Sequence, residues 1–224
     1  MKLTQDVYAY VWKGNDNNCN SYVFANALRG GKHILIDPGH VITPYLREPA
    51  FEMLVKEITA DNLKAEDIGL IALTHAHPDH VEGSAKFKAL SGAAVALHKD
   101  DEGPFRMFGG GKVDLVLSEG ELLTNPPTTS KLDVIHTPGH SPGEICLYWA
   151  QAKTLAVGDV VFYRSTGRTD LPGGDQGLLK DSIQRLAQLD VEYLLCGHPY
   201  NHPGVIKGRD AIKANFELIL EYYF

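Results

Sequence analysis

The chain has 224 residues, of which 44% are hydrophobic, and a formal net charge of −7 from 28 acidic and 21 basic residues. It is long enough to bury a sizeable core, either as one large domain or as two small ones. The acidic balance argues against nucleic acid as a partner, because a polyanion requires a basic face, but it permits a small anionic substrate held by a few local cations.

Runs of β-forming residues recur along the chain and predict strands. In the first half the predicted strands are Val7–Trp12, Asn20–Ala25, Lys32–Ile36, Leu70–Leu73 and Ala93–Leu97. In the second half they are Val113–Leu117, Glu121–Leu123, Lys131–Ile135, Glu144–Trp149, Thr154–Val157 and Glu192–Cys196.

Apolar residues at helical spacing predict helices between these strands. The predicted helices are Pro44–Thr59, Val81–Leu90, a helix capped by Asp175 that continues to Leu189, and Asp210–Tyr222. Residues 103–111 are rich in glycine and predict a mobile loop or lid. Because each half has several strands followed by helix, we expect an α/β fold over residues 1–224 as a single domain, a four-layer αββα sandwich.

Cysteine usage and hydropathy bear on the location of the protein. The three cysteines lie far apart and form no Cys-x-x-Cys pair, so no disulfide framework is indicated. No run approaches the ~18–20 apolar residues of a membrane helix, and the first residues lack the apolar block of a signal peptide. We therefore expect a cytoplasmic protein with no membrane partner.

The most informative segment is residues 74–80, Thr-His-Ala-His-Pro-Asp-His, directly after the predicted strand Leu70–Leu73. It places four potential metal ligands within six positions: His75, His77, Asp79 and His80. Imidazole and carboxylate groups suit a borderline divalent ion such as zinc, and two ions can share one compact loop. The segment predicts a metal site at the end of a buried strand.

Three later predicted strands are also followed by a candidate ligand, in order His140, Asp159 and His198. His140 lies in the turn Thr-Pro-Gly-His-Ser-Pro-Gly, and a glycine directly precedes both Asp159 and His198. Such glycines are expected where backbone must pack closely around a site built on a rigid sheet. These ligands are expected to complete the metal site.

This set of residues resembles the metallo-β-lactamase superfamily over about residues 20–200. The resemblance implies an αββα sandwich with the metal site at the sheet edge and a structural role for Asp37 in its Asp-Pro-Gly turn. It also implies that one ion is held by His75, His77 and His140, that a second is held by Asp79, His80 and His198, and that Asp159 bridges them.

Within the superfamily, the segment Gly167–Asp170 (Gly-Arg-Thr-Asp) looks like the glyoxalase II-like group. That group includes hydrolases of acylated glutathione and the related persulfide dioxygenases. Glyoxalase II proper carries a helical glutathione-binding domain after the last ligand, and the few residues after His198 do not provide one. Glutathione specificity therefore does not follow from the resemblance.

The leading hypothesis is a binuclear, zinc-dependent hydrolase of thioesters or esters, similar to hydroxyacylglutathione hydrolase. Two ions lower the pKa of a bridging water toward ~7, and the resulting hydroxide attacks the carbonyl. Asp79 would act in catalysis by orienting this hydroxide. Lactone or phosphoester hydrolysis by the same fold stays open as an alternative.

A second hypothesis is a persulfide dioxygenase that uses one iron. The resemblance to this group implies that His75, His140 and Asp159 would hold the iron. Two histidines and one carboxylate form the facial triad suited to ferrous oxygen chemistry. A third hypothesis is a metal-binding protein without catalysis. The sequence does not separate the first two, which differ in the ions bound.

Candidate substrate contacts lie close to the ligands in sequence. Arg164, Arg168 and Tyr200 are the predicted substrate-binding residues, because arginine binds carboxylates in bidentate fashion and tyrosine offers a hydroxyl. The structural alternative is that Arg168 pairs with Asp170 or Asp175 and only braces its loop. The expected partner is a small molecule, which can be anionic, and a homo-oligomer is compatible with the sequence.

Overall fold

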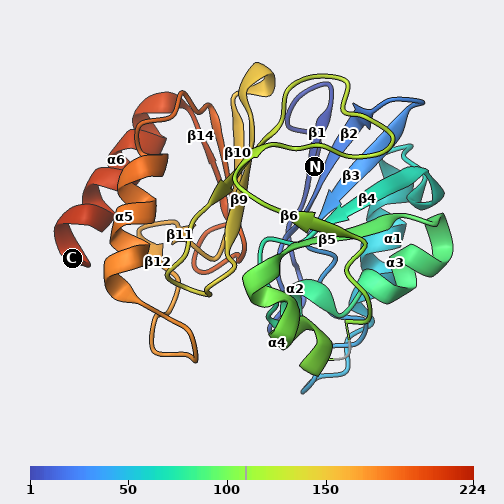
Figure 1. The fold of residues 1–224 in the computed structure, drawn as a ribbon, viewed down its shortest axis with the longest axis horizontal. Coiled ribbons are helices and arrows are strands. Elements are labelled where there is room, and N and C mark those ends of the chain that lie inside the picture. The colour runs from blue at the N-terminus through green and yellow to red at the C-terminus, as the bar shows by residue number, and fades with distance from the viewer. Residues whose placement is uncertain (109) are drawn as a thin grey trace.

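The computed structural model describes residues 1–108 and 110–224, in which two sheets pack face to face between outer helices (Figure 1). Within the described residues, each of these two sheets has six strands. The first consists, in spatial order, of β1 (Val7–Tyr10), β2 (Ser21–Leu28), β3 (Lys32–Ile36), β4 (Ile68–Ala72), β5 (Ala94–His98) and β6 (Leu115–Leu117). The second consists of β14 (Val205–Lys207), β13 (Tyr193–Cys196), β10 (Thr154–Gly158), β9 (Ile145–Trp149), β8 (Asp133–His136) and β7 (Gly120–Glu121).

Strand direction determines where the connecting loops meet. In the first sheet β3 to β6 run parallel, and in the second β10 runs parallel to β13, whereas the other neighbours are antiparallel. Loops that follow parallel neighbours leave the sheet at the same edge. The predicted α/β class and αββα layering are confirmed.

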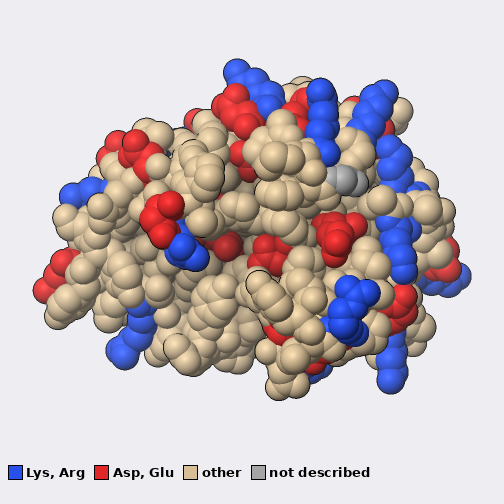
Figure 2. All heavy atoms as spheres, turned by 90° about the horizontal axis from the view of Figure 1, so that it is seen from below, with Lys and Arg blue, Asp and Glu red and all other residues tan. Residues whose placement is uncertain are grey.

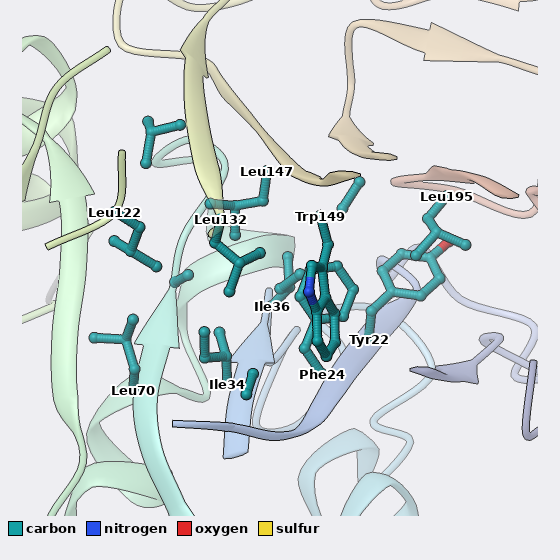
Figure 3. Close-up of a cluster of buried hydrophobic side chains, with 14 of the residues drawn as sticks. Tyr22, Phe24, Ile34, Ile36, Leu70, Leu122, Leu132, Leu147, Trp149 and Leu195 are labelled. Carbon is teal, nitrogen blue, oxygen red and sulfur yellow. The ribbon is translucent and has the colours of Figure 1, made fainter. Parts of the chain in front are cut away.

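The central core lies between the two sheets, and alternation along the strands builds it (Figure 3). In β4, Leu70 faces the opposite sheet whereas Ile71 faces the outer helices, as the period of two in a strand requires. Phe24 of the first sheet meets Trp149 of the second with ring centroids 5.2 Å apart. Burying such side chains contributes about 1.5–3 kcal/mol each and fixes how the sheets face one another.

Helices complete the outer layers. The first sheet is covered by α1 (Ala50–Ala60), α3 (Ser84–Ser91) and α4 (Glu102–Met107), and the second by α5 (Gln176–Leu186) and α6 (Arg209–Tyr222). Short 3-10 turns are η1 (Ala65–Asp67), η2 (Lys99–Asp101) and η3 (Ala150–Ala152). Within the described residues, no helix has both the length and the apolarity needed to cross a membrane.

The first two predicted helices differ most from their predicted bounds. The helix expected from Pro44 begins only at Ala50, because Pro49 lacks a backbone N–H and disfavours helical backbone at the residue before it. Asp16 Oδ2 also holds the preceding loop by accepting from the backbone N–H groups of Tyr45 and Leu46, both at 2.7 Å. The helix expected over Val81–Leu90 is two helices, the short α2 (Pro78–Val81) and α3.

Other differences concern short elements. Residues 103–111, predicted to be a loop, lie mostly in α4, whose Phe105 is fully buried; Gly109 lies outside the described residues. The hairpin of β11 (Val161–Phe162) and β12 (Ser165–Thr166) and the strand β14 were not predicted. Strands this short carry too few residues to show the alternation on which strand prediction depends.

Candidate metal centre

The seven predicted ligands come together at one edge of the sandwich, on loops that follow strands of both sheets. Residues 74–80 continue from β4 into α2. From the second sheet, His140 follows β8, Asp159 directly follows β10 and His198 follows β13. In Figure 1, α2 and the β11–β12 hairpin mark this edge in the lower half of the molecule, between the two halves.

The first group of ligand atoms belongs to His75, His77 and His140. The Nδ1 atom of His77 lies 2.9 Å from His75 Nε2 and 2.9 Å from His140 Nε2. Neutral imidazoles expose one lone pair each, and lone pairs aimed at one another repel unless a proton or a cation lies between them. This convergence of nitrogens therefore fits a metal ion.

The second group belongs to Asp79, His80 and His198. Here His80 Nε2 lies 3.2 Å from His198 Nε2, which in turn lies 3.3 Å from Asp79 Oδ2. Two imidazoles and one carboxylate provide the nitrogen and oxygen donors that bind zinc and other borderline divalent ions.

Asp159 lies between the two groups. Its Oδ1 is 3.3 Å from His80 Nε2, and its Oδ2 is 3.6 Å from His140 Nε2 and 3.4 Å from His198 Nε2. The buried Oδ1 accepts no hydrogen bond from any described residue. A buried carboxylate oxygen without a donor is costly in an apolar environment, so this atom fits a bound cation.

Groups behind the ligands hold the histidine rings. When one ring nitrogen is fixed by an acceptor, the other is left free to bind a metal, and such partners tune the affinity of metal sites. The contacts of the Nδ1 atoms are His75 with Thr74 Oγ1 at 3.0 Å, His80 with Asp37 Oδ2 at 3.0 Å, His140 with the Arg168 carbonyl at 2.8 Å and His198 with the Asn18 carbonyl at 3.1 Å.

In the first group, the surroundings keep the histidines in the neutral form that can bind a metal ion. Burial, followed by the neighbouring His80, holds the pKa of His75 well below its usual value. Burial and His140 lower the pKa of His77 to about 4. Both imidazoles therefore stay neutral at pH 7, which is the form that binds a metal.

The carboxylate side of the site attracts positive charge. Burial alone would raise the pKa of Asp159, but His198 and His80 hold it well below its usual value. Burial alone would lower the pKa of His80, yet Asp159 raises it overall. This part of the site binds a positive charge, and either a proton or a metal ion can supply it.

Three residues at the site escaped the sequence analysis: Asn17, Asp101 and Glu144. Asn17 donates a hydrogen bond from Nδ2 to Asp79 Oδ2 at 2.7 Å. Glu144 is fully buried and its Oε1 accepts from the backbone N–H of Asp159 at 3.1 Å. Asp101 binds two ligand-bearing loops. The one available signal was at Glu144, an acidic residue that begins the otherwise mostly apolar predicted strand Glu144–Trp149.

A cleft opens above the ligands. Residues that line its outer wall include Asn17, Phe162, Thr166, Arg168, Leu171 and Tyr200. Viewed from below the orientation of Figure 1, acidic residues occupy the middle of the molecule and most Lys and Arg side chains lie toward its margins (Figure 2).

The three predicted substrate-binding residues occupy different places. The Tyr200 ring is stacked on the His198 ring with centroids 4.7 Å apart, at the cleft wall. Arg168 also lines the cleft, with its guanidinium paired in bidentate fashion to Asp170 at 2.9 and 2.7 Å. The guanidinium of Arg164 instead lies 5.6 Å from the centroid of the Tyr163 ring.

An αββα sandwich with a histidine- and aspartate-rich centre at the sheet edge defines a class of metal-dependent enzymes. The family model described as the metallo-beta-lactamase superfamily matches residues 14–198, and the chain belongs to this superfamily. It is therefore a member of a metallo-hydrolase superfamily whose fold binds metal ions, and its predicted family is confirmed.

Individual relatives agree with this assignment. A probable metallo-hydrolase of Bacillus subtilis is 31% identical over 74% of this chain and 79% of its own length. A hydroxyacylglutathione hydrolase of Rhodospirillum rubrum is 31% identical over 74% of this chain, which spans only 59% of that enzyme. The crystal structure of TTHA1623 in a di-iron-bound form is 31% identical, with a TM-score of 0.65 over 85% of this chain and 91% of that one.

Proposed function

We propose that the chain is a binuclear metallohydrolase of thioesters or esters. The observation that carries the proposal is the position of Asp159, whose two carboxylate oxygens lie within 3.6 Å of ligand nitrogens from both groups. A carboxylate that contacts both ligand groups is what a ligand shared by two ions requires. The similarity to a hydroxyacylglutathione hydrolase supports the reaction type, and the di-iron form of TTHA1623 supports two ions.

Bound divalent ions would supply an activated water near neutral pH and polarise the carbonyl of the substrate. The residues of this chain provide the remaining functions. Asp79, held at Oδ2 by Asn17, orients the attacking water and accepts its proton. His140 and His198, each fixed through Nδ1 by a backbone carbonyl, keep their ligand nitrogens in place without reorganisation.

The cleft wall supplies the proposed substrate contacts. Burial and nearby Asp159 raise the pKa of Tyr200 to about 12, so its hydroxyl stays protonated at neutral pH and can donate a hydrogen bond. Arg168 can exchange its exposed partner Asp170 for a substrate carboxylate at little cost, because exposed ion pairs contribute only about 0–1 kcal/mol. Arg164 would reach a substrate only after leaving Tyr163.

Metal analysis together with a matched substrate panel tests the proposed function. Protein purified without added metal is expected to contain about two ions per chain, with zinc the proposed metal. It should hydrolyse an acyl thioester of glutathione or the same acyl group on N-acetylcysteamine, with release of free thiol. One iron per chain with oxygen uptake on glutathione persulfide would instead establish a dioxygenase. Turnover only of lactones or phosphoesters would reject the thioester assignment.

Asp159→Ala tests the bridging role directly. The substitution removes a ligand from both ions at once, so we expect both ions to be lost and hydrolysis to fall to background. Metal content by elemental analysis and initial rates are the measurements. Asp181→Ala, which removes an exposed carboxylate on α5, is the matched control and should behave as wild type. An Asp159→Ala variant with full metal content and near-normal turnover would refute the assignment.

A further inference from the structure

One buried carboxylate beside the site is not a ligand of either group. Asp101 lies at the end of η2, after β5 of the first sheet, and is 1% exposed. Its Oδ2 accepts hydrogen bonds from the Ala76 backbone N–H and from Ser141 Oγ, both at 2.9 Å. Its Oδ1 accepts from the Gly143 backbone N–H at 2.7 Å. Both oxygens of Asp101 are therefore occupied by loop donors.

These three donors belong to the loops that carry the first group of ligands. Ala76 is the residue between His75 and His77, and Ser141 directly follows His140. One carboxylate thus fixes the backbone beside every member of that group. The histidine loop extends from the first sheet and the turn with His140 from the second, so Asp101 also sets the distance between them.

Close packing shows that this arrangement is specific. A Cβ added to Gly143 would lie 2.7 Å from Asp101 N and 2.7 Å from Asp101 Oδ1, closer than real Cβ atoms approach. The last glycine of the Thr-Pro-Gly-His-Ser-Pro-Gly turn is therefore required by the contact with Asp101. The second group has a different support, since Asp37 contacts His80 and Asn17 contacts Asp79.

We propose that Asp101 is a positioning residue that sets the metal affinity of the group His75, His77 and His140, and leaves the group Asp79, His80 and His198 largely unaffected. Charge-assisted hydrogen bonds from the loop donors to the Asp101 carboxylate hold the ligand nitrogens of the first group close together before an ion binds. The proposal concerns metal binding alone, so it does not depend on thioester hydrolysis.

Asp101→Asn is the decisive variant because it preserves the shape of the side chain. An amide offers one oxygen in place of two, so its NH2 group must face a loop donor at one of the three contacts. We expect one of the two ions to bind about 10–100-fold more weakly, the usual effect of losing a group that orients a ligand. The other ion should keep its wild-type affinity.

The measurement is a competition titration of the metal-free protein with Co²⁺ against a chromophoric chelator. His77→Ala, which lacks a ligand of the first group, identifies the phase that belongs to that group. Asp181→Ala is the matched control, because Asp181 is an exposed carboxylate on α5 that belongs to none of the groups of side chains able to hold a metal ion. It should leave both phases unchanged.

The outcomes separate positioning from a general structural role. Loss of affinity confined to the phase identified by His77→Ala supports the proposal. Equal weakening of both ions, together with a lower unfolding temperature of the metal-free protein, would overturn it, as would wild-type affinity for both. If Asp101→Asn does not fold, Ser141→Ala removes one of the three contacts and should weaken the same ion by a smaller factor; unchanged affinity there would also overturn the proposal.

Discussion

Glycines beside the ligands allow the backbone to approach the centre closely. The backbone N–H of Gly197 donates to the Gly158 carbonyl at 2.7 Å, next to His198 and Asp159. A Cβ on Gly197 would overlap Asp159 Oδ1, the buried oxygen that accepts no hydrogen bond from the described residues. The glycine before His198 is thus needed to accommodate the carboxylate of Asp159, and the sequence indicated that backbone packs closely there.

Gly197→Ala should therefore damage the centre more than the fold. The new methyl group displaces the Asp159 carboxylate, and we expect lower metal content and a large loss of hydrolysis, with a cost to stability of about 1–3 kcal/mol from overpacking. Elemental analysis and urea unfolding measure the two effects. Gly103→Ala is the control, because a Cβ there meets nothing within 4 Å and lies in α4. Full metal binding by Gly197→Ala would contradict the prediction.

The clustering of the seven candidate ligands could be predicted from sequence, because each combines a metal-binding side chain with a position in a loop that follows a strand. Asp159, for example, directly follows the last residue of β10. Asn17 and Asp101 could not be predicted, because their roles are hydrogen bonds to loops distant in sequence. Asn17 reaches Asp79 across 62 positions, and Asp101 reaches Gly143 across 42. No spacing rule links such residues before the sheets are assembled.

At the scale of elements, α5 is linked to the turn that carries His140. Asp175 caps the helix, with Oδ1 accepting from the Leu178 backbone N–H at 2.9 Å, and its own N–H donates to the Gly139 carbonyl at 2.8 Å. Ser182 Oγ donates to the Pro138 carbonyl at 2.8 Å. The predicted cap at Asp175 is confirmed, and the helix ends at Leu186 rather than at Leu189.

Asp175→Ala removes this cap and leaves the backbone N–H of Leu178 without its acceptor. We expect the free energy of unfolding to fall by about 1 kcal/mol, the usual cost of losing an N-cap. Asp175→Asn should retain most of the stability, because asparagine caps almost equally well. Urea unfolding of the two variants measures the difference. Equal loss in both variants would show that the cap is not the cause.

The strands were predicted well and the first helix poorly for a physical reason. Runs such as Lys32–Ile36 are apolar and rich in β-formers, so local preference and burial agree. Residues 44–49 lie outside the helix because Pro49 cannot donate to the carbonyl four residues earlier and disfavours helical backbone at the residue before it. Asp16 also binds the N–H groups of Tyr45 and Leu46 and holds this segment as a loop. The proline is visible in the sequence, whereas the contact with Asp16 exists only in the folded chain.

At the scale of the whole molecule, the centre connects the two sheets. The first sheet contributes the four ligands of the loop after β4, and the second contributes His140, Asp159 and His198. Each proposed ion takes ligands from both sheets. Apolar packing such as Phe24 against Trp149 joins the sheets through their middle, and the ions would join them at one edge.

Removing the ions should consequently lower the stability of the whole sandwich. Binding to the folded state stabilises it by about 2.7 kcal/mol for each ion present at 100 times its dissociation constant. In a chain of this length each kcal/mol shifts the unfolding temperature by about 2–4 °C. We therefore expect a chelator that removes both ions to lower the unfolding temperature by about 10–20 °C, and added zinc to restore it. Asp159→Ala, which lacks the bridging ligand, should show little response to either. A wild-type protein that loses its metal without any change in unfolding temperature would show that the sheets do not depend on the ions for their association.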